Sequence, residues 1–273
     1  MTQQPAPPGV EALARRRAAA RAAHDYAAAD ALRAEIESAG WKVVDAGTEF
    51  RLEPASLSAA LPSRLDEPAM ARATIVIVDP ASAGPAADVQ LVDAAALIPA
   101  GGTLAAAWNA GLRVATGELV LFWPAGARMD MELAVRALAA LEDESVAIAG
   151  SHGLASADMR RWQPAPAGEV DALDAGLLCF RRDDGRQRGP LDERFVTPRH
   201  LAVWWSLLLR DEGPARPPRR AVAFAADGRH DLALPADPPR ERAERRDFYR
   251  LLDRFGARRD LLAEAAPVRP RTG

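Results

Sequence analysis

The stretch from Gly101 to Leu141 constrains the fold more than any other part of the chain, because it predicts a helix, a buried strand, a loop and a second helix. Apolar residues three to four positions apart predict the first helix over Leu104 to Val114. The continuous apolar run Leu119 to Trp123 is typical of a strand buried on both faces. The second helix is expected from about Met131 to Leu141. This is the unit of an open α/β sheet, which binds ligands in loops after the carboxyl ends of its strands.

Two segments carry a resemblance to a known family. Trp108 to Phe122, WNAGLRVATGELVLF, resembles the acceptor-side signature of family 2 glycosyltransferases, which have a GT-A fold. Gly189 to Phe195, GPLDERF, is similar to the family's G-x-x-D-E-R-F segment. The resemblance implies an open, mixed but mostly parallel sheet with helices on both faces, an α/β fold. It also implies an Asp-x-Asp pair after the strand, but here those positions are Pro124 and Gly126.

The resemblance implies a nucleotide-sugar site that includes Asp79, Asn109, Arg128 and His230. Asp79 ends the strand predicted over Ala73 to Val78, where the family holds its nucleotide, although a plain turn residue is an equally good interpretation. The family normally has an earlier strand and helix, and no such unit is found before Ala73: either Ala73 to Val78 replaces it, or the first βα unit has been lost. Arg128 or His230 is a candidate to replace the charge of a metal, whereas a single histidine cannot hold a metal ion. No cofactor is therefore expected, and no divalent metal in particular.

The catalytic base is also missing from its expected place. In the family, the helix after this second segment carries an acid that deprotonates the acceptor hydroxyl, because an unactivated hydroxyl is a poor nucleophile. Residues 195–210 contain no acid, so His200 and Asp192 are the remaining candidates. A histidine at a helix start is more often a surface or capping residue than a base. Trp204 and Trp205 are expected to pack in the core, with a sugar-stacking platform as the alternative.

The N-terminal part predicts a small helical hairpin followed by a short β-hairpin. Helical patterns run from Val10 to Gly40, and Asp25 is a suitable N-cap for the second helix. Trp41 to Asp45 and Glu49 to Leu52 are expected to pair as strands around a Gly-containing turn.

The spacing of charged and apolar residues in this hairpin, from Arg17 to Asp45, is similar to the C-terminal tail of cysteinyl-tRNA synthetases. The nucleotide motifs and cysteine zinc ligands of those enzymes are absent, so the resemblance covers no catalytic part. It implies a module that contacts RNA or a protein partner through Arg15, Arg17 and Arg21, because phosphates attract such clusters. A solvated basic helix face is the alternative.

Composition excludes several classes of protein. The net charge of the 273 residues is −3, so no general polyanion-binding surface is expected. The one cysteine, Cys179, lies in an apolar run and is expected in the core; alone it forms neither an internal disulfide nor a cysteine-based zinc site. No apolar run approaches the length of a membrane span and no signal-peptide pattern is seen, so the cytoplasm is the expected compartment.

The expected organisation has five parts. These are a disordered segment at 1–9, the helical hairpin at 10–53, a linker at 54–72, the glycosyltransferase-like domain at 73–264 and a disordered tail at 265–273.

The chemistry favours a degenerate member of the glycosyltransferase superfamily, a catalytically inactive or altered-site scaffold that binds a nucleotide sugar, a glycan or a protein partner. The alternative is an active, metal-independent enzyme that transfers a hexosyl group from a nucleotide donor. A second alternative is RNA or protein docking through the N-terminal hairpin. The sequence contains no competing catalytic motif, such as G-x-S-x-G or a P-loop.

Overall fold

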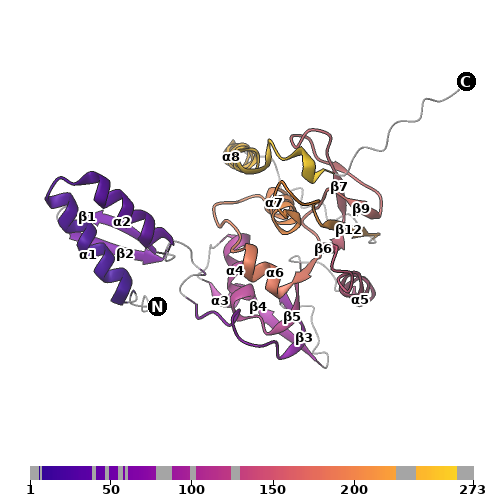
Figure 1. Ribbon diagram of the computed structural model, residues 1–273. Helices are drawn as coiled ribbons and strands as arrows, with labels where there is room; N and C mark the ends of the chain where they lie inside the picture. Colours follow the sequence, from indigo (N-terminus) through magenta and orange to yellow (C-terminus); the bar gives the residue numbers. More distant parts are fainter. Residues whose placement is uncertain are drawn as a thin grey trace, which may run out of the picture. The chain divides into compact units, whose positions relative to one another are not determined.

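The structure is a computed structural model, and it forms two compact units, Met1–Pro62 and Ser63–Gly273 (Figure 1). The residues that it describes are 6, 8–38, 41–46, 49–54, 58, 61–77, 88–98, 103–123, 130–225 and 238–262.

The N-terminal unit packs two helices on one face of a β-hairpin. Its elements are α1 (Pro8–Ala22), α2 (Tyr26–Ser38), β1 (Trp41–Ala46) and β2 (Glu49–Pro54), with β1 and β2 antiparallel. The buried side chains come from both helices and from β1: Val10, Ala14, Ile36, Trp41 and Val43. Asp25 Oδ1 accepts a hydrogen bond from Ala28 N at 3.0 Å, so the predicted N-cap of the second helix is confirmed.

The larger unit is built on a mixed sheet of seven strands in the order β4-β3-β5-β11-β6-β12-β9. Their bounds are β3 (Ala71–Ile77), β4 (Val89–Asp93), β5 (Gly117–Trp123), β6 (Val146–Ser151), β9 (Gly168–Val170), β11 (Leu178–Arg181) and β12 (Arg220–Phe224). The pairs β3-β4, β3-β5 and β6-β12 are parallel, whereas β11 is antiparallel to both neighbours and β9 is antiparallel to β12. A small second sheet contains β7 (Gly153–Ala155), β8 (Gln163–Pro164) and β10 (Ala172–Leu173).

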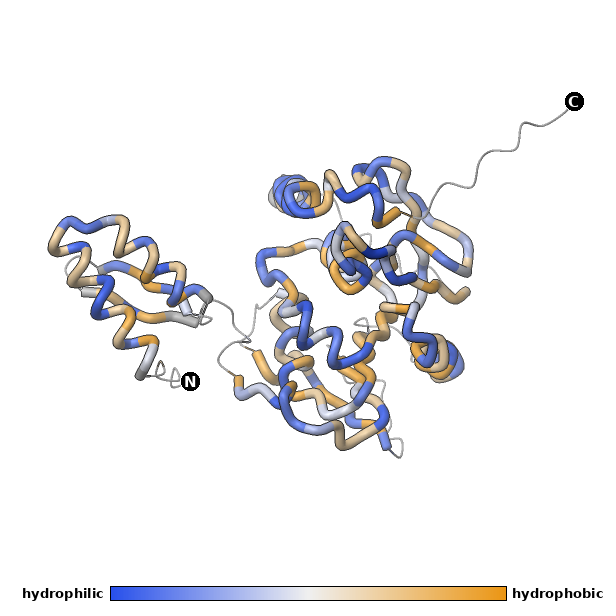
Figure 2. The backbone as a smooth tube through the Cα atoms, viewed as in Figure 1, coloured by the Kyte–Doolittle hydropathy of each residue, from blue (hydrophilic) through white to orange (hydrophobic). Residues whose placement is uncertain are grey.

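Helices lie on both faces of the large sheet. They are α3 (Ala94–Leu97), α4 (Leu104–Val114), α5 (Met131–Ala140), α6 (Arg182–Arg188), α7 (Pro198–Arg210) and α8 (Pro238–Phe255), and a short 3-10 helix follows at Arg259–Leu261. One core cluster joins α4 and α7 to one sheet face, and a second joins α5 to the other. In Figure 2 the exposed α6 is mostly hydrophilic, whereas strands of the sheet are mostly hydrophobic. The predicted mixed α/β fold, with its N-terminal helical pair and β-hairpin, is confirmed.

Aromatic rings run through the core from α4 to α7. Trp108 stacks on Phe122 with ring centroids 4.7 Å apart, and Phe180 contacts Phe122 at 4.9 Å and Trp205 at 5.3 Å. Trp204 stacks on Trp205 at 6.4 Å. Both tryptophans of α7 are buried, so their predicted role in core packing is confirmed. Cys179 is also fully buried, as expected.

A polar cluster fixes the amino ends of the parallel strands. Gln90 Oε1 accepts hydrogen bonds from Thr74 Oγ1 at 2.8 Å and from Thr116 N at 2.7 Å. Gln90 Nε2 donates to Val114 O at 3.1 Å, and Thr74 Oγ1 accepts from Gly117 N at 2.8 Å. This cluster therefore joins β3, β4 and the turn between α4 and β5, which sets their register.

Part of the expected linker belongs to the larger unit. Arg64 N donates to Arg113 O at 2.7 Å, and Met70 N donates to Thr116 O at 2.8 Å. The buried Arg182 guanidinium also donates to Glu67 O at 2.8 Å. These bonds hold residues 63–70 against the start of β5.

Candidate functional site

The carboxyl ends of β3, β4 and β5 form the edge of the sheet where a ligand is expected. Ile77 pairs with both Asp93 and Trp123, so the three strands end side by side. The chain passes from β3 to β4 on one side and then returns to β5 on the other side of β3. Such a reversal of strand order is a topological switch point, where open α/β sheets bind ligands.

Several residues predicted for this site lie outside the described part of the chain. They are Asp79, Pro124, Gly126, Arg128 and His230. The sequence alone shows that neither Pro124 nor Gly126 supplies a side-chain oxygen. The residues at these two positions therefore do not fit the divalent metal that the family resemblance implies.

Helix α4 places Asn109 in the interior, where its side chain joins two parts of the chain by hydrogen bonds. Its Nδ2 donates to Leu191 O at 2.8 Å and to Glu193 Oε1 at 3.0 Å, and its Oδ1 accepts from Leu191 N at 2.8 Å. The side chain is 1% exposed. Asn109 thus joins the two segments that resemble family 2 glycosyltransferases, and its amide is already occupied by protein groups.

The segment Gly189 to Phe195 also contacts the amino end of α4. Thr103 Oγ1 accepts a hydrogen bond from Ala106 N at 3.1 Å as the N-cap and donates to Glu193 O at 3.3 Å. Because α4 runs antiparallel to β5, its amino end lies towards the carboxyl edge of the sheet. The contact between Thr103 and Glu193 therefore lies towards that edge.

Asp192, one candidate for the base, is held by its neighbour Arg194. Arg194 Nε donates to Asp192 Oδ1 at 2.9 Å, and Arg194 Nη2 donates to Asp192 Oδ2 at 2.6 Å. Burial by itself raises the pKa of this carboxyl, but the hydrogen bonds from the Arg194 side chain and backbone outweigh it, so the pKa lies below its usual value. A carboxylate stabilised in this way is a weak proton acceptor.

His200, the other candidate, lies in the first turn of α7. Its Nδ1 is 2.8 Å from Thr197 Oγ1, which in turn lies 2.8 Å from Asp247 Oδ2. The single hydroxyl proton of Thr197 goes to the Asp247 carboxylate, so the hydrogen-bond network assigns the proton of neutral His200 to Nδ1. Burial lowers the pKa of His200 below its usual value, although the charges of Asp247 and Glu244 partly oppose this shift.

Asp247 was not anticipated from the sequence, and it organises this end of the molecule. The carboxylate is fully buried and accepts from Val196 N at 2.9 Å and from Thr197 N at 2.7 Å. Arg250 Nη1 donates to its other oxygen at 2.9 Å. An acid on α8 therefore satisfies the free amides that precede α7 and complements the helix dipole. No local sequence motif predicts this contact, because the two partners are about fifty residues apart.

In the N-terminal unit, the three arginines predicted to bind a partner have different surroundings. Arg17 is 6% exposed, and both of its terminal nitrogens donate to the Asp45 carboxylate, at 2.8 and 3.0 Å. Arg21 also contacts Asp45, and Arg15 forms an exposed pair with Glu11 at 3.3 Å. Arg17 is therefore committed to joining α1 to β1, whereas Arg15 and Arg21 remain at the surface.

A pocket of about 380 Å³ lies at the opposite edge of the sheet, near the first residues of β3 and β5. Leu119, Leu138 and Leu141 supply its apolar lining, and Arg72 and Glu118 are among its charged residues. This hollow is separate from the switch point. It is therefore not the nucleotide-sugar site that the sequence predicts.

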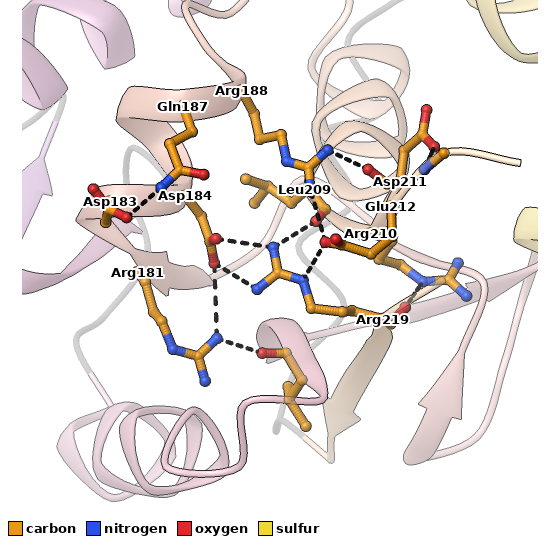
Figure 3. A network of polar contacts seen from close by, with 12 residues as sticks. Arg181, Asp183, Asp184, Gln187, Arg188, Leu209, Arg210, Asp211, Glu212 and Arg219 are labelled. Atoms are coloured by element: carbon orange, nitrogen blue, oxygen red, sulfur yellow. Dashed lines mark hydrogen bonds and ion pairs between the residues drawn. The ribbon is translucent and has the colours of Figure 1, made fainter. Parts of the chain in front are cut away.

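A network of arginines and acids joins the end of α7 to α6 and β12 (Figure 3). Arg219 donates two hydrogen bonds of 2.9 Å to the Asp184 carboxylate, and Arg210 Nε donates to Arg219 O at 2.8 Å. Arg188 Nη2 donates to Glu212 Oε1 at 2.6 Å. The network stabilises the packing of these elements, and its charged groups are paired with one another.

Two further observations concern metal binding and membrane spanning in the described residues. No three or more His, Cys, Asp or Glu side chains among them are grouped as a metal ion would require. Across the same residues, no helix has both the length and the apolar character needed to cross a membrane.

Comparison with known proteins supports one of the two sequence resemblances. A stretch of 49 residues is 53% identical to a cysteine–tRNA ligase of Opitutus terrae, which is 18% of this chain and 11% of the ligase. The chain thus spans about a tenth of the length of the curated relative that it matches. Known family models give no match to the chain. The glycosyltransferase-like character of the larger unit consequently remains a prediction from its sequence motifs.

Proposed function

We propose that this chain is a glycosyltransferase-like scaffold that binds a nucleotide sugar or a glycan at the carboxyl edge of its sheet without transferring the sugar. The observation that carries the proposal is that Asn109 and Asp192 are both engaged in hydrogen bonds within the protein. Asn109 is bonded to the backbone of Leu191, and Asp192 is bonded to Arg194. A transferase needs a base of suitable pKa beside the acceptor hydroxyl. The low pKa of Asp192 makes it unsuitable for that role.

The topology of the sheet supports the proposed position of the site. The strands β3, β4 and β5 end together at a switch point. Thr103, at the amino end of α4, is hydrogen-bonded to Glu193 near that edge. Pro124 and Gly126 occupy the positions where the resemblance implies acids. Stabilisation of a departing diphosphate by a metal therefore lacks its protein ligands there, while binding of a sugar or a nucleoside needs no such ligands.

A thermal-shift titration tests the proposal with uridine, guanosine and thymidine diphosphate sugars, each with and without manganese. Any ligand that binds the native state raises its melting temperature. We expect a shift with at least one donor that does not depend on manganese, and no sugar transfer or hydrolysis. Asp79→Asn should reduce the shift, while Glu118→Gln at the opposite edge should leave it unchanged. The absence of any shift would reject nucleotide-sugar binding and direct the search to glycans.

The first alternative is a metal-independent transferase, and one observation favours it. The chain of hydrogen bonds from His200 through Thr197 to Asp247 fixes the histidine tautomer and leaves Nε2 as the basic nitrogen. This arrangement differs from a bare surface histidine. If it acts as a base, donor turnover should occur without metal, and His200→Gln should abolish it while the melting-temperature shift with the donor remains.

The second alternative is docking of RNA or a protein by the N-terminal unit. It is supported by the 53% identity of 49 residues to a cysteine–tRNA ligase, whose name states that it acts on tRNA. Arg15, Arg16 and Arg21 are the exposed arginines of α1 that phosphates can reach. Salt-sensitive binding of a transfer RNA should be lost in the triple variant Arg15→Ala, Arg16→Ala, Arg21→Ala. Arg33→Ala is the control, because this arginine is also exposed and paired with an acid one turn away, as Arg15 is, but lies on α2.

A further inference from the structure

Among the described residues, the outer face of α5 carries a stripe of apolar side chains that are largely exposed. Met131 is 45% exposed and Val135 is 59% exposed, and Leu138 is half-buried beside them. These residues are spaced i, i+4 and i+7, so they lie in one line along the helix. The helix buries a different set of side chains against the sheet: Leu133, Ala134 and Ala137. Leu138 also packs against the core cluster under α5, so Met131 and Val135 are the members of the stripe that lie at the surface.

The stripe continues into the pocket at the amino edge of the sheet. Leu138 belongs to both, and the buried Leu119 and Leu141 also line the pocket, together with charged residues such as Arg72 and Glu142. The volume of about 380 Å³ accepts a large flexible side chain. A helix face that ends in such a hollow has the features of a helix-packing surface.

Charges of opposite sign flank one side of the stripe. Glu132 and Arg136 are both exposed and lie one turn apart. The Arg136 guanidinium carbon lies 5.5 Å from the centre of the Phe224 ring, which places this charge beside the helix. Neither residue takes part in an ion pair recorded for the described part of the chain. The Glu132 carboxylate is therefore open to a partner, and Arg136 remains exposed although its guanidinium already lies over the Phe224 ring.

We propose that α5 is a homodimer contact, packed antiparallel against α5 of a second copy of this chain. A two-fold axis near Ala134 and Val135 places Met131 of the second copy over Leu138 and its pocket. The same axis places Glu132 opposite Arg136 of the second copy, and the symmetry repeats the pair. Charge complementarity and the fit of a methionine to the pocket thus both favour α5 of a second copy as the partner of this helix.

The contact is small, so the dimer is weak. A helix of ten residues is about 15 Å long. Its packing buries an area near the lower limit for specific interfaces, which gives transient, concentration-dependent association.

Sedimentation velocity of the full chain, from low micromolar to near-millimolar concentration, tests the proposal. Wild type should pass from monomer to dimer. Val135→Glu should weaken dimerisation about tenfold or more, because it places a carboxylate in the apolar contact. Tyr249→Glu is the control, since this exposed residue lies on α8 and outside the stripe. A wild type that stays monomeric throughout, or a Val135→Glu variant that dimerises normally, would overturn the proposal.

A charge exchange distinguishes a second copy from any other partner. Glu132→Arg and Arg136→Glu should each weaken the dimer, because each places like charges opposite one another. The double variant should restore it, since exchanged charges again face opposite charges in a symmetric antiparallel pair. Melting temperatures show whether each variant is folded. Failure of the folded double variant to recover would reject the antiparallel arrangement.

Discussion

Asn109 shows how a residue expected to bind a ligand can serve the fold instead. Asn109→Ala removes its three hydrogen bonds and leaves the buried Leu191 amide without its partner. We expect the free energy of unfolding of the larger unit to fall by about 2–4 kcal/mol. Urea denaturation measures this loss. If the variant kept wild-type stability and lost only nucleotide-sugar binding, the structural role assigned to Asn109 would be wrong.

Gly150 occupies a place that only glycine fits. A Cβ atom there would lie 1.8 Å from Leu177 O, a backbone atom that cannot move aside without disturbing β11. Gly150→Ala should therefore destabilise the larger unit by about 3 kcal/mol or more in denaturant titrations. Gly9→Ala in α1 is the contrasting change, because no atom lies within 4 Å of its added Cβ, and it should be neutral or slightly stabilising. A mild effect at Gly150 would mean that the two strands can separate locally.

His200 makes stability depend on pH in a predictable direction. Burial lowers its pKa in the folded state, so the unfolded chain binds a proton more readily. The stability that His200 contributes is therefore complete above its unfolded pKa, near 6.5, and is lost as the pH falls towards its folded pKa. Proton NMR titration should find the pKa of His200 below the usual value for histidine. Asp247→Asn should lower the pKa of His200 further, because the Asp247 charge raises it.

At the scale of elements, the contact between α7 and α8 depends on one buried carboxylate. Asp247→Ala leaves the amides of Val196 and Thr197 without an acceptor and Arg250 without its ion pair. We expect a loss of about 3–5 kcal/mol, the usual cost of breaking a buried, hydrogen-bonded charge pair. Hydrogen exchange should locate the effect at residues 194–201. If residues 194–201 of the variant were as well protected from hydrogen exchange as those of the wild type, α7 would not need this cap.

The elements that sequence reasoning identified are those with a clear apolar pattern. The buried run of β5 and the helical spacing of α4 and α5 predicted elements within a residue or two of those observed. By contrast, α6 was not predicted, because RDDGRQR has no apolar periodicity and owes its helix to tertiary contacts such as those of Arg182.

The candidate site was predictable only in part, for a physical reason. Its general place follows from the strand ends, which the apolar patterns reveal. The roles of Asn109, Asp192 and His200 depend on partners that meet only in the folded chain. Asp247 in particular is one of several acids in a charged helix, and sequence alone does not show which of them turns inward.

At the scale of the whole molecule, two separate cores predict two separate responses to acid. The hydrogen bonds from Arg17 lower the pKa of Asp45 from 3.8 to about 2. The stability that this carboxylate gives the N-terminal unit is thus present above about pH 4 and is lost as the pH falls through about 2. Arg17→Met should move the acid unfolding of this unit to higher pH. The exposed Arg33→Met is the control, and an equal effect of both changes would contradict a special role for Arg17.

The tryptophans give these two units distinct optical signatures. Trp41 alone belongs to the N-terminal unit, and the other five lie in the larger one. The rings of Trp204 and Trp205 are inclined by only 20°, a geometry whose coupled transitions contribute to near-ultraviolet circular dichroism. That dichroism therefore reports the packing of the larger core, while the emission of Trp41 responds to the opening of the helical hairpin. The chain carries its own spectroscopic labels, one set for each half, and each unfolding event can be followed without an added dye.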